Sequence, residues 1–562
     1  MENIATLAHD YWELLLREEP ISATFYGDSR YDDRLDERGP EARERQLKAH
    51  QALLRRLKSI SSDQLTEEDK VTYDILQFKI EEFIESLKYN DWEWGLDHLF
   101  GPHIFWMDLI DYHPLKTEKN YEDLLKRYGA IPASMNLYIA DLRMGLRSGR
   151  VASYVAYNHV VQQLQTFLAQ KPETTRYAEC LKIFPNTFSD VQKKDIEQKI
   201  MKTIINAVFP AYQKLLNFLL SDYQSKVRST VGIKFLPQGE AAYAFRIRIH
   251  TTTSFTPKEL HELGLEELKK NQVEMQGIAK KMGHSGSLRE FLEVVKGDRK
   301  NYFSREEDIL KKHVATLEGM KSLLPAYFKT LPTIKFEIKK MPTFKAPSSP
   351  AAYYYPPTQD GSRPGIFWMN THKPEQWAVH TMESLAYHEA VPGHHLQIAL
   401  ATEQKQLPTF RRHAHFTAYI EGWAHYAERL SDEMGAYSDD LQRLGMLIDQ
   451  AWRAIRLVID TGIHYFGWTR DQALQFMREQ RVTTEADMEN EVDRYIIWPG
   501  QALAYKVGQR VISDVREAAK KELKEKFDLR EFHDVVLLSG PVPLSILKNR
   551  VQAWVVAKKK QP

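Results

Sequence analysis

The sequence contains only one cysteine, Cys180, among its 562 residues. A single thiol cannot form an intrachain disulfide, and it cannot build a cysteine-rich metal site. Because Cys180 lies in a mostly apolar run, we expect it to be a core residue rather than a nucleophile. Any metal ion must therefore be held by histidine and carboxylate side chains.

The chain also lacks an excess of one charge and any long apolar run. Lysine and arginine total 77, against 76 for aspartate and glutamate, and no basic segment with interleaved aromatics indicates a nucleic-acid partner. No apolar run approaches the ~20 residues of a membrane span, and the first residues do not resemble an export signal. The sequence therefore predicts no nucleic-acid or membrane partner and a cytoplasmic location.

Proline and glycine are sparse and fall between long segments, such as residues 41–60 and 68–87, in which apolar residues recur every three or four positions. This spacing predicts amphipathic helices and a mainly α fold. A chain of 562 residues is expected to form more than one packed lobe. We place a helical N-terminal lobe at residues 1–330 and a catalytic lobe at residues 331–562.

One stretch departs from the helical pattern. Residues 333–337 alternate in a strand-like way. Further on, a hairpin is predicted with residues 356–364 as its loop and residues 365–370 as its second strand. We expect a small antiparallel sheet near residues 333–370, which either closes a helical core or exposes an edge that hydrogen-bonds an extended peptide.

The segment after this sheet is an altered zinc motif, His388-Glu389-Ala390-Val391-Pro392-Gly393-His394-His395. In an HExxH helix, two histidines four residues apart bind zinc, and the glutamate activates a water molecule. Here His394 follows His388 by six residues, so an unbroken helix would point the two apart. Pro392 disfavours that helix, and a bulge would return His394 to the metal. His395 is the alternative ligand, and otherwise we expect it to face substrate.

A third ligand is expected because a catalytic zinc has three protein ligands and one open position. Residues 419–428 predict a helix that carries Glu421, His425 and Glu428 near one face. Glu421 begins this face and is the expected ligand. His425 or Glu428 could orient the primary ligands through hydrogen bonds.

These segments, YHEAVPGHHLQ and YIEGWAHYAE, resemble the bacterial zincin-like family known as domain of unknown function 885. The later segments RLVIDTGIHYFGWTRDQAL and RYIIWPGQALAYKVG look like further signatures of the same family. The family is distantly similar to helical gluzincins such as thimet oligopeptidase, angiotensin-converting enzyme and carboxypeptidase Taq. The resemblance implies two helical lobes flanking a deep cleft, one zinc ion on His388, His394 and Glu421, and Glu389 as general base.

Later segments offer further groups for the reaction. The developing oxyanion needs hydrogen-bond donors, for which Tyr505 is favoured over Lys506. On spacing alone, Arg456 and His464 could belong to a salt-bridged helix surface, but the resemblance favours a catalytic role for His464. We expect Arg456 and Tyr495 to contact substrate. An arginine there would bind a terminal carboxylate, as in a carboxypeptidase or dipeptidyl carboxypeptidase. An acidic pair that binds an amino terminus would instead indicate an aminopeptidase, and the sequence does not decide between them.

The sequence thus predicts a zinc metallopeptidase that hydrolyses oligopeptides, in which Glu389 takes a proton from water and delivers it to the leaving amine. Two other interpretations are a helical binding or scaffold protein with a structural or absent metal, and a zinc hydrolase of non-peptide amides or esters.

Overall fold

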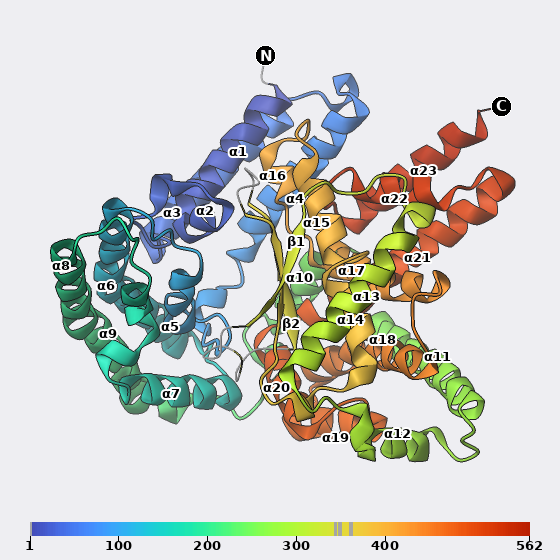
Figure 1. The fold of residues 1–562 in the computed structure, drawn as a ribbon. Helices are drawn as coiled ribbons and strands as arrows, with labels where there is room; N and C mark the ends of the chain where they lie inside the picture. The colour runs from blue at the N-terminus through green and yellow to red at the C-terminus, as the bar shows by residue number, and fades with distance from the viewer. Residues whose placement is uncertain (1–2, 342–345, 347–350, 359–362, 562) are drawn as a thin grey trace. The chain divides into compact units, whose positions relative to one another are not determined.

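A computed structural model describes residues 3–341, 346, 351–358 and 363–561 of the chain. Helices dominate these residues, and one small sheet accompanies them (Figure 1). The mainly α fold expected from the apolar periodicity is therefore confirmed. Contacts within the chain divide it into two compact units, residues 1–242 and residues 243–562.

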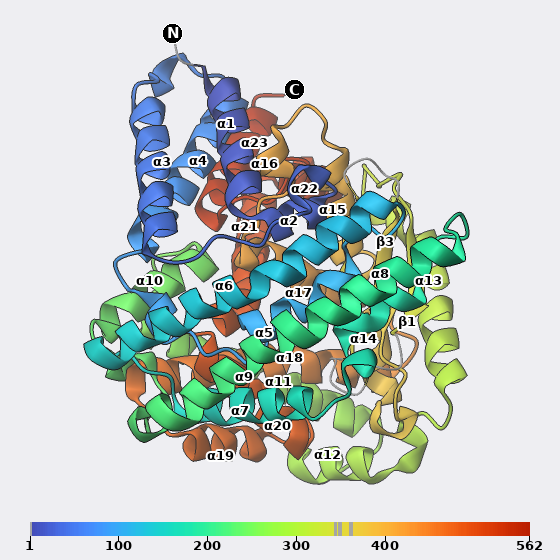
Figure 2. The ribbon, with the colours of Figure 1, turned by 90° about the vertical axis from the view of Figure 1, so that its left-hand side faces the viewer.

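Unit 1 is helical, and its longest helix is α6 (Glu118–Ser148), which packs against α9 (Figure 2). Thr117 and Asn120 form a reciprocal capping box that starts α6. Gly149 ends it in a left-handed conformation, with φ of 79°. The other helices of this unit are α1 (Ile4–Glu18), α2 (Pro20–Tyr26), α3 (Pro40–Lys58), α4 (Glu67–Ser86), α5 (Pro102–Phe105), α7 (Tyr154–Leu168), α8 (Asp190–Thr203) and α9 (Phe209–Phe218).

Unit 2 carries all the predicted site residues. Its most extensive helix pairs are α11 with α18 and α17 with α21. Its helices are α11 (Pro257–Lys281), α12 (Leu288–Gly297), α13 (Glu306–Tyr327), α14 (Met382–Glu389), α15 (His394–Glu403), α16 (Thr409–Arg412), α17 (Thr417–Glu433), α18 (Asp440–Thr461), α19 (Arg470–Gln480), α20 (Glu485–Ile497), α21 (Ala504–Leu523), α22 (Leu529–Leu537) and α23 (Leu544–Lys559); α10 (Gly239–Thr251) crosses the division.

Two glycines allow α17 and α21 to pack with their backbones in contact. A Cβ atom on Gly508 would lie 1.8 Å from the Ala418 carbonyl oxygen, and one on Gly422 would lie 2.4 Å from the Gly508 Cα atom. No larger residue fits at either position without separating the helices. Because α17 carries Glu421 and Glu428, this close packing fixes where their carboxylates lie.

The sheet of unit 2 has three strands in the order β1-β3-β2, namely β1 (Phe336–Lys340), β2 (Ala352–Tyr355) and β3 (Gly365–Met369). The predicted hairpin is present as the antiparallel pair β2 and β3. The expectation of a wholly antiparallel sheet is wrong, because β1 pairs with β3 in parallel. Strand β1 occupies the edge of β3 opposite to β2, and it therefore runs in the direction opposite to β2.

The contact-based division falls at residue 242 rather than near residue 330. The reason lies in packing within unit 2, where α11 lies along α18 and α13 packs against α14. The predicted catalytic lobe, residues 331–562, lies wholly within unit 2. Among the described residues, no helix combines the length and apolar character needed to span a membrane.

Candidate metal centre

The altered zinc motif is an interrupted helix. Helix α14 ends at Glu389, the backbone leaves the helical conformation at Ala390 (φ −106°, ψ −104°), and α15 begins at His394. The Val391–Pro392 peptide bond is cis. The indole Nε1–H of Trp423 donates to the Pro392 carbonyl oxygen at 2.9 Å, which ties the interruption to α17. The sequence expectation that Pro392 breaks the helix is confirmed.

Gly393 makes this interruption possible. A Cβ atom at this position would lie 2.0 Å from the His388 carbonyl oxygen and 2.4 Å from that of Tyr387. The backbone of Gly393 therefore lies directly against the last turn of α14. This close approach brings His394 back beside His388 although six positions separate them.

Three side chains converge at the interruption: His388, His394 and Glu421. The Glu421 Oε2 atom lies 3.5 Å from His388 Nε2 and 3.6 Å from His394 Nε2. The two imidazole rings are nearly perpendicular, with centroids 4.7 Å apart. One ligand atom from each residue lies within 4.8 Å of the others. Two imidazoles and a carboxylate form a donor set that suits zinc, so the residues predicted as ligands fit a metal ion.

His395, the alternative ligand, is turned away from this group. Its Nδ1 atom lies 2.7 Å from the Tyr354 hydroxyl and its Nε2 atom lies 3.1 Å from the Ile334 carbonyl oxygen. Nε2–H thus donates to the carbonyl and Nδ1 accepts from the tyrosine. Neither nitrogen is free for a metal ion or for a substrate unless one of these bonds breaks. His395 instead joins α15 to β2.

Glu428 orients His388 from behind. This fully buried carboxylate accepts from His388 Nδ1 at 2.7 Å and lies 3.0 Å from His425 Nδ1. Gln450 Nε2 donates to it at 3.0 Å. Of the two orienting residues suggested by sequence, Glu428 therefore acts directly, and His425 supports it. With Nδ1 engaged, Nε2 is the atom that His388 presents toward Glu421.

The electrostatics of this group favour charged carboxylates. Burial alone would lower the pKa of His388, but hydrogen bonds with Glu421 and Glu428 raise it to about 10. Burial would raise the pKa of Glu421, yet its bonds with both ligand histidines hold that pKa well below the usual value. Glu428 is likewise kept ionised against burial by the attraction of His425 and its hydrogen bonds to His388 and His425. The two carboxylates therefore stay ionised although they are buried.

Glu389, the predicted base, has a carboxylate without a hydrogen-bond or ion-pair partner among the described residues. Its side chain is 9% exposed, and among the described residues it makes no hydrogen bond or ion pair. It does not belong to the group of ligand atoms that converge. A buried carboxylate that follows a candidate ligand and makes no hydrogen bond among the described residues is a candidate for proton transfer.

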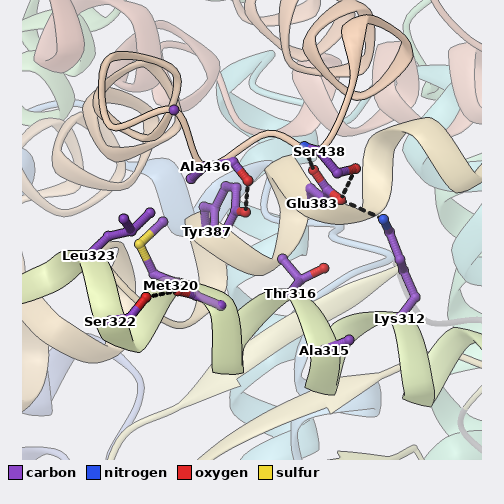
Figure 3. A pocket seen from close by; sticks show the side chains of 12 residues that line it. Lys312, Ala315, Thr316, Met320, Ser322, Leu323, Glu383, Tyr387, Ala436 and Ser438 are labelled. Carbon is purple, nitrogen blue, oxygen red and sulfur yellow. Dashed lines mark hydrogen bonds and ion pairs between the residues drawn. The ribbon is translucent and has the colours of Figure 1, made fainter.

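The far side of α14 is anchored next to a cavity of about 350 Å³ (Figure 3). Glu383 pairs with Lys312 of α13 and accepts from the Ser438 backbone and hydroxyl. The Tyr387 hydroxyl donates to the Ala436 carbonyl oxygen at 2.8 Å. These bonds hold the helix that carries His388. None of the three candidate ligands lines this cavity.

The remaining predicted site residues form a second group between α18, α20 and α21. The Arg456 Nε–H donates to the Tyr495 hydroxyl at 3.1 Å, and the guanidinium lies 4.4 Å from the centre of the Tyr505 ring. His464 Nε2 lies 2.9 Å from the Tyr495 carbonyl oxygen, and its ring packs against Tyr243. The structure therefore brings Arg456, Tyr495 and Tyr505 together and links His464 to them through the backbone.

Sequence reasoning missed two charged members of this group. Glu491 accepts from Arg456 and from Tyr495, at 2.9 and 2.6 Å. Arg453 lies 4.0 Å from Glu428. Glu491 precedes Tyr495 by one helical turn, which is a signal that could have found it. Nothing in the spacing of Arg453 identifies its partner on α17.

One protein family and two solved structures match this chain. The family model described as bacterial protein of unknown function (DUF885) matches residues 20–551. A crystal structure of a candidate lipoprotein from Colwellia psychrerythraea is similar, with a TM-score of 0.93 and 28% identity over 99% of this chain and 100% of that one. A structure of a candidate lipoprotein of unknown function from Shewanella oneidensis shares the fold, with a TM-score of 0.74 and 19% identity over 98% of this chain and 99% of that one. None of the curated proteins matches the chain.

Proposed function

Because the chain belongs to the bacterial DUF885 family, whose description assigns no activity, we propose from its own residues that it is a zinc-dependent peptidase. One observation carries the proposal. Two imidazole Nε2 atoms and a carboxylate converge beside Glu389, a buried carboxylate without partners among the described residues. A metal-activated hydrolase needs this combination of ligands and base.

When bound by His388, His394 and Glu421, zinc supplies Lewis-acid polarisation of a peptide carbonyl and of a water molecule. The Glu389 carboxylate takes one proton from the water as its oxygen bonds to the carbonyl carbon. Glu389 then hands that proton to the peptide nitrogen as the carbon–nitrogen bond breaks. A carboxylic acid and an amine are released, and no covalent enzyme intermediate forms.

Tyr505 suits the role of oxyanion donor. Its hydroxyl oxygen accepts from the Arg494 guanidinium at 3.1 Å, which leaves the phenolic hydrogen free to be donated. Because Arg494 already orients the Tyr505 hydroxyl, this donor needs little reorientation when negative charge develops on the substrate oxygen. The matching expectation is a lower kcat in Tyr505→Phe with little change in KM.

The edge of the sheet offers a place for an extended peptide. In the order β1-β3-β2, the outer edge of β2 has no partner strand among the described residues. Strand β2 packs against α14, and its Tyr354 bonds to His395, the residue after His394. A peptide paired with β2 would lie beside the candidate ligands, and main-chain pairing accepts many sequences.

The proposal is tested with protein purified without added zinc. We expect about one zinc ion per chain by emission spectrometry, and cleavage of a peptide library. Glu389→Gln should keep its zinc and lose cleavage by about 10²- to 10⁴-fold, because only the base is removed. Glu375→Gln, an exposed carboxylate in the same unit, is the matched control and should cleave as wild type does.

The other outcomes are equally informative. Equal cleavage by Glu389→Gln and wild type would contradict the mechanism. Zinc without hydrolysis of any peptide, ester or amide would support a scaffold with a structural metal. Hydrolysis confined to esters or non-peptide amides would keep the centre and change the substrate.

The cellular location is a separate proposal. The sequence favours the cytoplasm, whereas the proteins of the two similar structures are described as candidate lipoproteins. We propose the cytoplasm, and fractionation of source cells with an antibody to the chain tests it. Recovery in the membrane fraction would contradict it.

A further inference from the structure

Three arginines of unit 2, Arg453, Arg456 and Arg494, form a cluster in which the buried Nη1 donor of Arg456 has no hydrogen-bond partner among the described residues. Arg456 is 6% exposed. Its Nε and Nη2 atoms donate to Tyr495 and to Glu491, but Nη1 has no hydrogen-bond partner among the described residues. An unpaired buried N–H of a charged group costs free energy that a bound acceptor would recover.

The side chains around this donor carry more positive than negative charge. Arg456 and Arg494 both pair with one carboxylate, Glu491, at 2.9 and 3.2 Å. The neighbouring Arg453 is occupied by Asp449 at 2.9 Å. Two guanidinium groups thus share one carboxylate, which leaves one positive charge in excess in a largely buried place. Such an excess favours the binding of one singly charged anion.

The cluster lies next to the candidate metal centre, and two of its side chains are partly exposed. Arg453, one helical turn before Arg456 on α18, lies 4.0 Å from the Glu428 carboxylate, which in turn binds His388. The side chains of Glu491 and Arg494 remain 18% and 20% exposed. A ligand that enters past them would meet Arg456 within the same unit as the candidate zinc ligands.

We propose that this cluster binds the C-terminal carboxylate of the peptide substrate, with Arg456 Nη1 as its central donor. The inference rests on the proposed peptidase function and sharpens it to a carboxypeptidase that removes one or two residues. A guanidinium matches a carboxylate in shape and charge. Tyr505 packs against the Arg456 guanidinium at 4.4 Å and keeps its plane fixed.

The test compares two peptides that differ only in the C-terminus, a free acid and an amide. Wild type should cleave the acid about 100-fold more efficiently in kcat/KM, since the amide removes one charge-assisted bond. Mass spectrometry should show loss from the C-terminal end. Arg456→Gln should lower kcat/KM for the acid much more than for the amide, so that the preference for the acid largely disappears. Arg478→Gln, a more exposed arginine paired with Glu485, is the control.

Binding separates this inference from the proposed function. The Glu389→Gln protein is titrated calorimetrically with both peptides, so no turnover is needed. Tighter binding of the acid supports the carboxylate site even when no hydrolysis is found. Equal cleavage and equal binding of the two peptides would overturn the inference while leaving a peptidase in place. An equal loss on both peptides in Arg456→Gln would assign the arginine a structural role. If Arg456→Gln does not fold, Arg456→Lys serves, and an unchanged preference for the acid would refute the proposal.

Discussion

Replacing Glu428 by glutamine removes the negative charge that orients His388. The wild-type carboxylate is fully buried and accepts from His388 Nδ1 at 2.7 Å and from Gln450 Nε2 at 3.0 Å. Glutamine has the same size, but its amide nitrogen would face one of these donors. The substitution therefore weakens the support of a candidate ligand without opening a cavity.

The expected effect is a loss of zinc affinity of about 10- to 100-fold, or ~1.4 to 2.7 kcal/mol, which is typical when the partner of a metal-bound histidine is changed. Removing a ligand itself should cost more, because Glu421 bears one of the three donor atoms. Replacing the proposed base, Glu389, should leave the zinc affinity unchanged. The affinities should thus follow the order Glu389→Gln, Glu428→Gln and Glu421→Gln, with the tightest first.

The assay is a competition titration of metal-free protein against a zinc chelator of known affinity. Each variant is first checked for an unchanged melting temperature, so that loss of structure is not counted as loss of affinity. Zinc binding by Glu428→Gln as tight as in wild type would refute the orienting role. Affinity lost in Glu389→Gln as strongly as in Glu421→Gln would make Glu389 a ligand instead of the base.

Two further predictions concern the backbone and pH. Gly393→Ala should lower the free energy of unfolding by at least ~2 kcal/mol, because the added Cβ would lie 2.0 Å from the His388 carbonyl oxygen. Both the melting temperature and the zinc content should therefore fall, and unchanged values of both would contradict this prediction. Burial raises the pKa of Asp460 to about 7. Between pH 4 and 7 the unfolded chain releases a proton that the folded protein keeps, so this carboxyl lowers stability by about 1.4 kcal/mol per pH unit as pH rises. As pH rises from 4 to 7, the melting temperature of Asp460→Asn should therefore rise relative to that of wild type. A difference between the two melting temperatures that does not change with pH would contradict this prediction.

Local chemistry explains what the sequence could predict about the site. Pro392 lacks an amide hydrogen and Gly393 lacks a side chain, so the interruption of the helix follows from two residues. Once the helix is interrupted, His394 can approach His388, and Glu421 begins the acidic face of the next long helix. Each of these inferences needs only neighbours in the chain.

What escaped prediction depends on contacts between distant segments. The parallel pairing of β1 with β3 joins segments more than twenty residues apart, and the alternation within either strand does not specify its direction. His395 points to the sheet because Tyr354 and Ile334 offer it partners, and neither is near it in sequence. The unbalanced charge at Arg456 arises only where α18 and α20 meet at Glu491. No periodicity in one segment contains that information.

The arrangement of buried charge also favours a site that acts on a substrate over a scaffold held by metal. Glu428 lies between His388 and Arg453, 2.7 and 4.0 Å away. Well-packed apolar side chains would stabilise the core at lower cost than these groups, so stability alone does not account for them. A structural zinc takes four protein ligands, whereas three donors converge among the described residues. A zinc ion held by three protein ligands would keep a coordination position for water, and Glu389 follows the candidate ligand His388 directly in the chain. Three protein ligands would be too few for a structural zinc, and they match the number that the proposed hydrolase requires.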